Sequence, residues 1–282
     1  MSYSAEISRT SPTAFLFLID QSGSMADPVG QTKMSRAQFV SDALNRVVVN
    51  LIARCSKSEG VRDYFEIGAI GYGGAQVGNA LKGPFASKMF HPISDFEKSP
   101  ISIEQRRQKV PDGAGGVIEQ TIQFPIWFTP QADGGTPMRK ALRIAAESLA
   151  VWCDEHAESY PPTVLHVTDG EPSDGDPEPV AEQLRQIGTD DGDILLFNLH
   201  SGQAKGSPLK FADDENHVID PYGKSLFRMS SELPAAVAQA AREKGYQVSP
   251  HARGFFFNVE PVEVVEFFDI GTRASSQSLM LR

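Results

Sequence analysis

Three short polar segments carry side chains whose types and spacing could bind a metal ion. Asp20, Ser22 and Ser24 lie in DQSGS, directly after the apolar run FLFLI. Thr136 lies in DGGTPM, and Asp169 ends the segment TVLHVTD. Hard cations of the Mg²⁺ kind prefer carboxylate and hydroxyl oxygens, and the set has no thiolate or imidazole of the kind that zinc prefers. These five residues therefore predict a divalent-cation site made of oxygen atoms alone.

The elements around these segments must bring them together. Apolar runs predict strands, and apolar residues at helical spacing predict helices. We expect strands at 13–19, 64–70, 163–168, 193–199 and 254–259, and helices at 33–55, 137–152, 176–187, 233–244 and 262–270. Thr136 is expected to cap the helix that begins at Pro137. This alternation predicts an α/β fold with a doubly wound, mostly parallel central sheet flanked by helices, similar to a Rossmann fold. The polar segments then fall at one edge of that sheet, at the carboxyl ends of its strands.

A long insertion interrupts the α/β pattern at about residues 74–132. Apolar residues alternate with mostly polar ones between Ile118 and Phe128, which predicts at least one antiparallel strand. Because a structureless loop of this length is uncommon in a compact domain, we expect a hairpin or an extended sheet edge. We divide the chain into a tail at 1–12, one domain at 13–259 that includes the insertion, and a helix and tail at 260–282.

Composition restricts the class of protein. The formal net charge of −10 argues against a surface for duplex nucleic acid. The amino terminus lacks a basic start followed by an apolar run, and no apolar stretch approaches membrane-spanning length. Cys55 and Cys153 both fall in predicted helices; two reduced, buried thiols are favoured over one disulfide. We expect a soluble, cytoplasmic protein that binds neither nucleic acid nor membrane.

The segment DQSGS resembles the D-x-S-x-S motif of von Willebrand factor A (vWA) domains, also called integrin I domains. Thr136 in GGT and Asp169 in TDG match the other two parts of that family's metal-ion-dependent adhesion site, in the family's order. The resemblance covers about residues 13–259 and is closest to intracellular bacterial members. It implies that Ser22, Ser24 and Thr136 bind the metal directly, and that Asp20 and Asp169 act through water. The segment between the first motif and Thr136 is longer than is usual in the family.

The resemblance also implies a function. Such a domain binds Mg²⁺, with Mn²⁺ or Ca²⁺ as alternatives, and an Asp or Glu carboxylate of a partner protein completes the coordination of the metal. Neutral hydroxyls donate little charge, so the cation stays electrophilic and favours an external anionic oxygen. The expected role is a scaffold or regulatory subunit of a bacterial complex, with a kinase, phosphatase or ATPase as partner.

A Mg²⁺-dependent hydrolase of the haloacid-dehalogenase type is the alternative, with Asp20 as nucleophile. Such enzymes place a second acidic residue two positions further on, where this chain has Ser22. The chain also lacks a G-x-S-x-G elbow and a Walker A loop. We therefore expect a binding protein and not an enzyme.

Several polar residues near these segments have simpler interpretations. Ser22 and Ser24 would be loop hydroxyls if the metal site were absent. Asp176 is expected to cap a helix rather than bind a second ion, and His166 is expected to be a core histidine. Arg106 and Arg107, in the insertion, form either a solvated face or a contact for an acidic partner.

Overall fold

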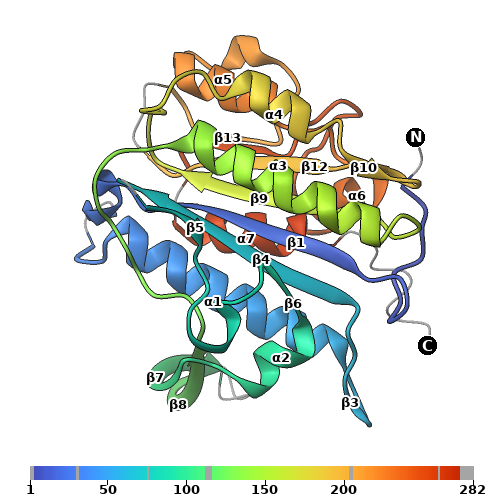
Figure 1. Cartoon of the computed structure of the whole chain (residues 1–282). Coiled ribbons are helices and arrows are strands. Elements are labelled where there is room, and N and C mark those ends of the chain that lie inside the picture. The colour runs from blue at the N-terminus through green and yellow to red at the C-terminus, as the bar shows by residue number, and fades with distance from the viewer. Residues whose placement is uncertain are drawn as a thin grey trace.

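The computed structural model describes residues 3–29, 32–74, 76–111, 116–202, 206–259 and 261–273. Its centre is one sheet, drawn in Figure 1, whose strands are β1 (Thr13–Asp20), β4 (Phe65–Gly73), β5 (Gln76–Asn79), β6 (Phe90–Pro92), β9 (Thr163–Thr168), β12 (Leu195–His200), β13 (Leu209–Lys210) and β14 (Phe255–Phe257). The strand order is β13-β14-β12-β9-β1-β4-β5, and β6 also pairs with β4. The five strands from β14 to β4 are parallel, whereas β5, β6 and β13 run antiparallel to their neighbours. The predicted doubly wound, mostly parallel sheet is confirmed.

Helices cover both faces of this sheet (Figure 1). One face packs against α1 (Arg36–Cys55), α6 (Ala235–Glu243) and α7 (Pro261–Gly271), and the other against α3 (Met138–Glu155), α4 (Glu178–Leu184) and α5 (Pro221–Met229). The side chains of β1 alternate between the two layers: Phe15 and Phe17 join the α1 layer, and Leu16 and Leu18 join the α3 layer. β1 is therefore buried on both faces, as its continuous apolar run predicts.

The insertion forms both a sheet edge and a hairpin, the two structures considered for it. β5, β6 and the short helix α2 (Ile93–Lys98) extend the edge of the sheet beside β4. β7 (Ser102–Pro111) and β8 (Val117–Ile126) pair only with each other and project beside α1 (Figure 1). Arg106 of β7 links the hairpin to α1: its guanidinium packs 4.0 Å from the ring of Phe124, in β8, and lies 2.8 Å from the carboxylate of Asp42, in α1.

Some elements differ from the sequence prediction. Helix α5 was not predicted, although Asp220 caps it and Pro221 is its first residue. Helix α7, which was predicted, packs on the sheet: the ring of its Phe268 lies edge-on against that of Phe17 of β1, with ring centroids 5.6 Å apart. The remaining short strands form two hairpins, β2 (Ser56–Lys57) with β3 (Gly60–Val61) and β10 (Gly188–Thr189) with β11 (Gly192–Asp193).

Both cysteines are free and buried. Burial raises the pKa of the Cys55 thiol and of the Cys153 thiol to about 12, so neither is a ready nucleophile at neutral pH. None of the described helices is long and apolar enough to cross a membrane.

Candidate metal centre

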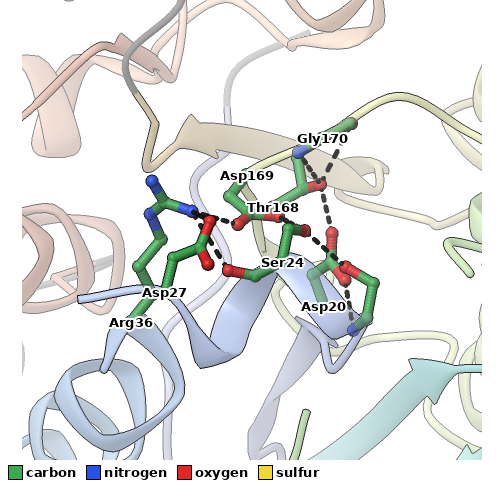
Figure 2. Close-up of polar contacts among 8 residues, drawn as sticks. Asp20, Ser24, Asp27, Arg36, Thr168, Asp169 and Gly170 are labelled. Atoms are coloured by element: carbon green, nitrogen blue, oxygen red, sulfur yellow. Dashed lines mark hydrogen bonds and ion pairs between the residues drawn. The ribbon is translucent and has the colours of Figure 1, made fainter. Parts of the chain in front are cut away.

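The first and third motifs lie side by side because their strands are neighbours. β1 and β9 run parallel, and Ile19 pairs with Val167, so Asp20 lies beside Thr168 at the carboxyl end of the pair. The chain leaving β1 turns through the short 3-10 helix η1 (Gly23–Ala26), and the chain leaving β9 begins with Asp169. Figure 2 shows the two aspartates on either side of Ser24.

Hydrogen bonds link four of the five predicted ligands. The Ser22 amide donates to Asp20 Oδ1 at 2.8 Å, and the hydroxyls of Ser22 and Ser24 lie 3.1 Å apart. The Ser24 hydroxyl donates to Asp169 Oδ1 at 2.7 Å (Figure 2). Two side chains 145 positions apart in the sequence are thus joined directly. The fold brings these oxygens into one continuous cluster.

The predicted cap of α3 by Thr136 is wrong. The helix begins at Met138, and the flanking Pro137 makes no side-chain cap. Instead the Asp174 carboxylate reaches back from the loop after β9 and accepts from the amides of Arg139 and Lys140, at 3.0 and 2.8 Å. The helix end is therefore satisfied without the Thr136 hydroxyl.

Thr136 faces the same cluster. Its amide donates to the Ser173 hydroxyl at 2.9 Å, which ties the GGT loop to the loop after β9. A Cβ atom added to Gly170 would lie 3.9 Å from Ser24 Oγ and 4.0 Å from Thr136 Oγ1, so both hydroxyls border one small space. All five predicted side chains therefore lie together at this edge.

The cluster of oxygens is buried at its inner end and exposed to solvent at its outer rim. Asp20 and Ser22 are only 1% and 2% exposed, whereas Ser24 is exposed. Burial raises the pKa of the Asp20 carboxyl, against hydrogen bonds from Ser22 and Thr168 that lower it. Among the described residues, no basic side chain forms an ion pair with Asp20. A bound cation would supply the missing countercharge.

Direct backbone contacts hold the motif loops in place. The Gly23 amide donates to the Gly134 carbonyl at 2.8 Å, and the Asp133 amide donates to the Gln21 carbonyl at 2.8 Å. A Cβ atom on Gly73 would lie 2.2 Å from the Gln21 carbonyl oxygen. Gly134 has a positive φ of 64°, and a Cβ atom there would lie 2.3 Å from the Gly74 Cα atom. Only glycine allows the main chains to approach this closely.

Sequence reasoning missed two residues of the site. The Thr168 hydroxyl donates to Asp20 Oδ2 at 2.6 Å, and Arg36 Nη1 lies 2.8 Å from Asp169 Oδ2 (Figure 2). Thr168 directly precedes Asp169 and could have been found from that position. Arg36 could have been noticed because it is a basic residue at the start of a helix, where the helix dipole disfavours positive charge, which indicates that something else holds it there.

The donor set fits a hard divalent cation. It consists of two carboxylates and three hydroxyls, the ligand types that Mg²⁺ prefers. Within the described residues, no three His, Cys, Asp or Glu side chains gather in a way that could hold a metal. The predicted site uses three hydroxyl ligands, and a group made only of His, Cys, Asp and Glu side chains would not include them. Binding of a metal at this site stays a prediction.

Two residues nearby had simpler interpretations. Asp176 lies just before α4, and its Oδ1 accepts from the Glu178 amide at 3.0 Å, although the cap position itself is Pro177, which makes no side-chain cap. His166 lies in the core between Tyr72, 2.6 Å from its Nε2, and Asn198, 2.7 Å from its Nδ1. Burial lowers the pKa of His166 to about 4, so the ring is neutral at physiological pH.

Comparison with solved structures finds similarities at low sequence identity. Proximal thread matrix protein 1 from the mussel byssus has a TM-score of 0.50 and 14% identity, over 95% of this chain and 48% of that one. Manganese-loaded Plasmodium vivax TRAP protein has a TM-score of 0.41 and 15% identity, over 94% of this chain and 75% of that one. The vWF domain of the pilus tip protein Mfa5 from Porphyromonas gingivalis has a TM-score of 0.31 and 14% identity, over 86% of this chain and 56% of that one.

The likeness to the mussel protein concerns the fold alone, a mostly parallel sheet flanked by helices. The chain spans about half the length of the mussel protein. No family model and no curated protein matches the sequence.

Proposed function

We propose that this protein is a metal-dependent interaction module that captures a carboxylate of a partner protein. Ser22, Ser24 and Thr136 would bind Mg²⁺ directly, and Asp20 and Asp169 would hold it through water. When bound there, the cation would act as a Lewis acid and accept an Asp or Glu oxygen of the partner as a further ligand. Mn²⁺ and Ca²⁺ are the alternative ions.

The observation that supports this proposal most is the hydrogen-bonded cluster of oxygens between Asp20 and Asp169, with a buried base and an exposed Ser24. An anionic group from outside can reach the exposed rim, whereas the buried Asp20 needs a countercharge that no described basic residue supplies. Hydroxyl ligands leave most of the cation's charge for the incoming carboxylate. The site is thus suited to binding an anionic oxygen.

We further propose that the protein acts in the cytoplasm, as a scaffold or regulatory subunit for a kinase, phosphatase or ATPase, and that it is not itself an enzyme. Position 22, where a phosphatase of the Asp-nucleophile type carries a second acid, is a serine whose hydroxyl lies against Ser24. If purified protein hydrolysed phosphate or carboxylate esters, and Asp20→Ala removed that turnover, the hydrolase alternative would replace this proposal.

Metal binding is the first test. Electron paramagnetic resonance can count free Mn²⁺ in the presence of protein, and Mg²⁺ should compete. We expect Ser22→Ala to lose binding, whereas Ser58→Ala, at an exposed serine of the β2–β3 turn, keeps it. Equal binding by both variants would place the ion elsewhere.

Partner capture is the second test. Wild-type protein and Ser22→Ala should be compared as baits in native extract, first with Mg²⁺ and then with chelator. We expect a set of partners that is retained only by wild-type protein with Mg²⁺. Identical capture under all conditions would contradict a metal-dependent contact.

A further inference from the structure

A fixed positive charge lies inside the predicted cation site. Arg36 Nη1 is 2.8 Å from Asp169 Oδ2 and 3.1 Å from the Ser24 carbonyl oxygen (Figure 2). The side chain of Asp169 is fully buried, and that of Arg36 is 17% exposed. The pair is therefore shielded from solvent, and a guanidinium in this position makes a strong, directional bond to a carboxylate.

Helix stability does not explain an arginine at this position. Arg36 is the first residue of α1, whose first turn has no acidic residue. The amino end of a helix carries partial positive charge, so a cation there is unfavourable. Ser35 already caps the helix, since its hydroxyl accepts from the Gln38 amide at 3.1 Å. What holds the guanidinium in place is the site, through Asp169 and Ser24.

The two oxygens of Asp169 differ in what a metal would require of them. Oδ1 accepts from the Ser24 hydroxyl at 2.7 Å. That bond is compatible with metal binding, because a hydroxyl can donate its proton and still offer a lone pair to a cation. Oδ2 accepts from Arg36, so a metal-held water at this oxygen would stand beside the guanidinium and share the carboxylate charge with it.

Arg36 has a second acidic partner outside the cluster. Asp27 Oδ2 lies 3.4 Å from the same Nη1 atom, and the Asp27 side chain is 64% exposed. A guanidinium that leaves Asp169 can therefore pair with Asp27 at the rim. Displacement would not leave a buried charge without a partner.

We propose that Arg36 is a built-in competitor of the divalent cation, which holds Asp169 in the metal-free protein and lowers the metal affinity of the site. This inference depends on the proposed function. The consequence is a site that loads only when the concentration of free cation is high enough to displace the guanidinium toward Asp27. Arg36 thereby sets the concentration range in which the partner is captured.

The expected size of the effect follows from Coulomb's law. Even at the dielectric constant of water, a unit charge about 5 Å from a divalent ion weakens its binding on the order of tenfold. Removing the charge but keeping a polar side chain, as in Arg36→Gln, should tighten Mn²⁺ and Mg²⁺ binding by about that factor or more. Arg36→Lys keeps the charge and should stay close to wild type.

Calorimetric titration of Mg²⁺ and resonance titration of Mn²⁺ into four proteins test the proposal: wild type, Arg36→Gln, Arg36→Lys and the control Arg46→Gln. Arg46 is an exposed arginine on the same helix, so its variant makes the same change in net charge away from the site. We expect a decrease in Kd of about tenfold for Arg36→Gln and of less than about twofold for Arg46→Gln. Circular dichroism spectra of all four should agree.

Each other outcome has a distinct meaning. If wild type binds metal and Arg36→Gln binds equally or more weakly, the competitor inference is wrong and the proposed function stands. If neither binds metal, both fail. If Arg36→Gln does not fold, nuclear magnetic resonance of wild-type protein tests the inference instead. The ¹⁵N resonances of the Arg36 guanidinium, identified by their absence in Arg36→Lys, should shift when Mg²⁺ is added. Unchanged resonances at saturation would contradict the displacement.

Discussion

Replacing Asp20 by asparagine should abolish metal binding without loosening the fold. The asparagine side chain would keep one carbonyl oxygen to accept from the Ser22 amide, as Asp20 does at 2.8 Å. Its amide nitrogen would donate to the Thr168 hydroxyl, which now donates to Asp20 at 2.6 Å. The Thr168 proton could then turn to the Gly170 carbonyl oxygen, which lies 3.4 Å away. Every hydrogen bond of the buried group therefore has a replacement, and the buried negative charge is removed.

The size of the metal effect can be worked out from the length of the chain. A cation present at 100 times its Kd adds about 2.7 kcal/mol to the free energy of unfolding. Unfolding 282 residues has an entropy of roughly 0.6 kcal/mol per kelvin near 60 °C. Saturating Mg²⁺ should therefore raise the Tm of wild-type protein by about 4 to 5 °C, whereas Asp20→Asn should gain less than about 1 °C.

The pH dependence of the metal-free proteins supplies a second readout. The pKa of Asp20 is raised above its ordinary value of 3.8 in the folded state, so the folded protein binds this proton more tightly than the unfolded chain. The free energy of unfolding then falls as the pH rises from 3.8 through the raised pKa. The free energy of unfolding of Asp20→Asn should not show this decrease, so at pH 7 the variant should be at least as stable as metal-free wild type.

Differential scanning calorimetry with Mg²⁺ and with chelator measures both effects. A Tm increase in Asp20→Asn as large as that of wild type would refute the reasoning, because it would place the cation away from this cluster. A large loss of stability in metal-free Asp20→Asn would show that the carboxylate is needed for the fold itself.

Three further predictions concern the fold, the loops and the insertion. Far-UV circular dichroism should be unchanged by chelator, because the core is built from apolar strands and not around the ion; global unfolding would contradict this. Gly73→Ala should weaken Mn²⁺ binding at least about tenfold, because its Cβ would lie 2.2 Å from the Gln21 carbonyl oxygen, whereas Gly78→Ala, where a Cβ meets open space, should bind normally. Arg107→Ala, at an exposed side chain, should weaken binding of only some of the metal-dependent partners, whereas Arg106→Ala also removes the link between the hairpin and α1. If titration of the recovered partners reveals no change with Arg107→Ala, the insertion is structural and selectivity lies elsewhere.

The sheet and its helices could be predicted because their signals are local. The continuous apolar run around Phe17 predicts a buried strand, and the apolar residues of α1 recur at helical spacing. The polar residues after β1 and β9 could be placed at the sheet edge because they come directly after the apolar runs end. Strand β7 could not be predicted in this way, because SIEQRRQKVP is mostly polar and is ordered by pairing with β8. Helix α5 has only nine residues and contains Gly223, so its apolar pattern is short.

The composition of the candidate site could be read from the sequence, but its connections could not. The role of Thr136 was assigned from its neighbours, yet the α3 cap comes from Asp174, which is more than 30 positions away. The Arg36 contact with Asp169 spans 133 positions. Such contacts depend on how the loops fold over the edge of the sheet, and no local pattern encodes them.

The backbone contacts between the motif loops also separate two kinds of evolutionary constraint. Because the Asp133 amide, and not its side chain, holds the Gln21 carbonyl oxygen, the exposed side chain at position 133 is free to vary. A change there would alter the charge and shape of the rim without moving the residues beneath it. Under the proposed function, variants selected from a library at this position would differ in partner choice while the predicted cation ligands stay in place.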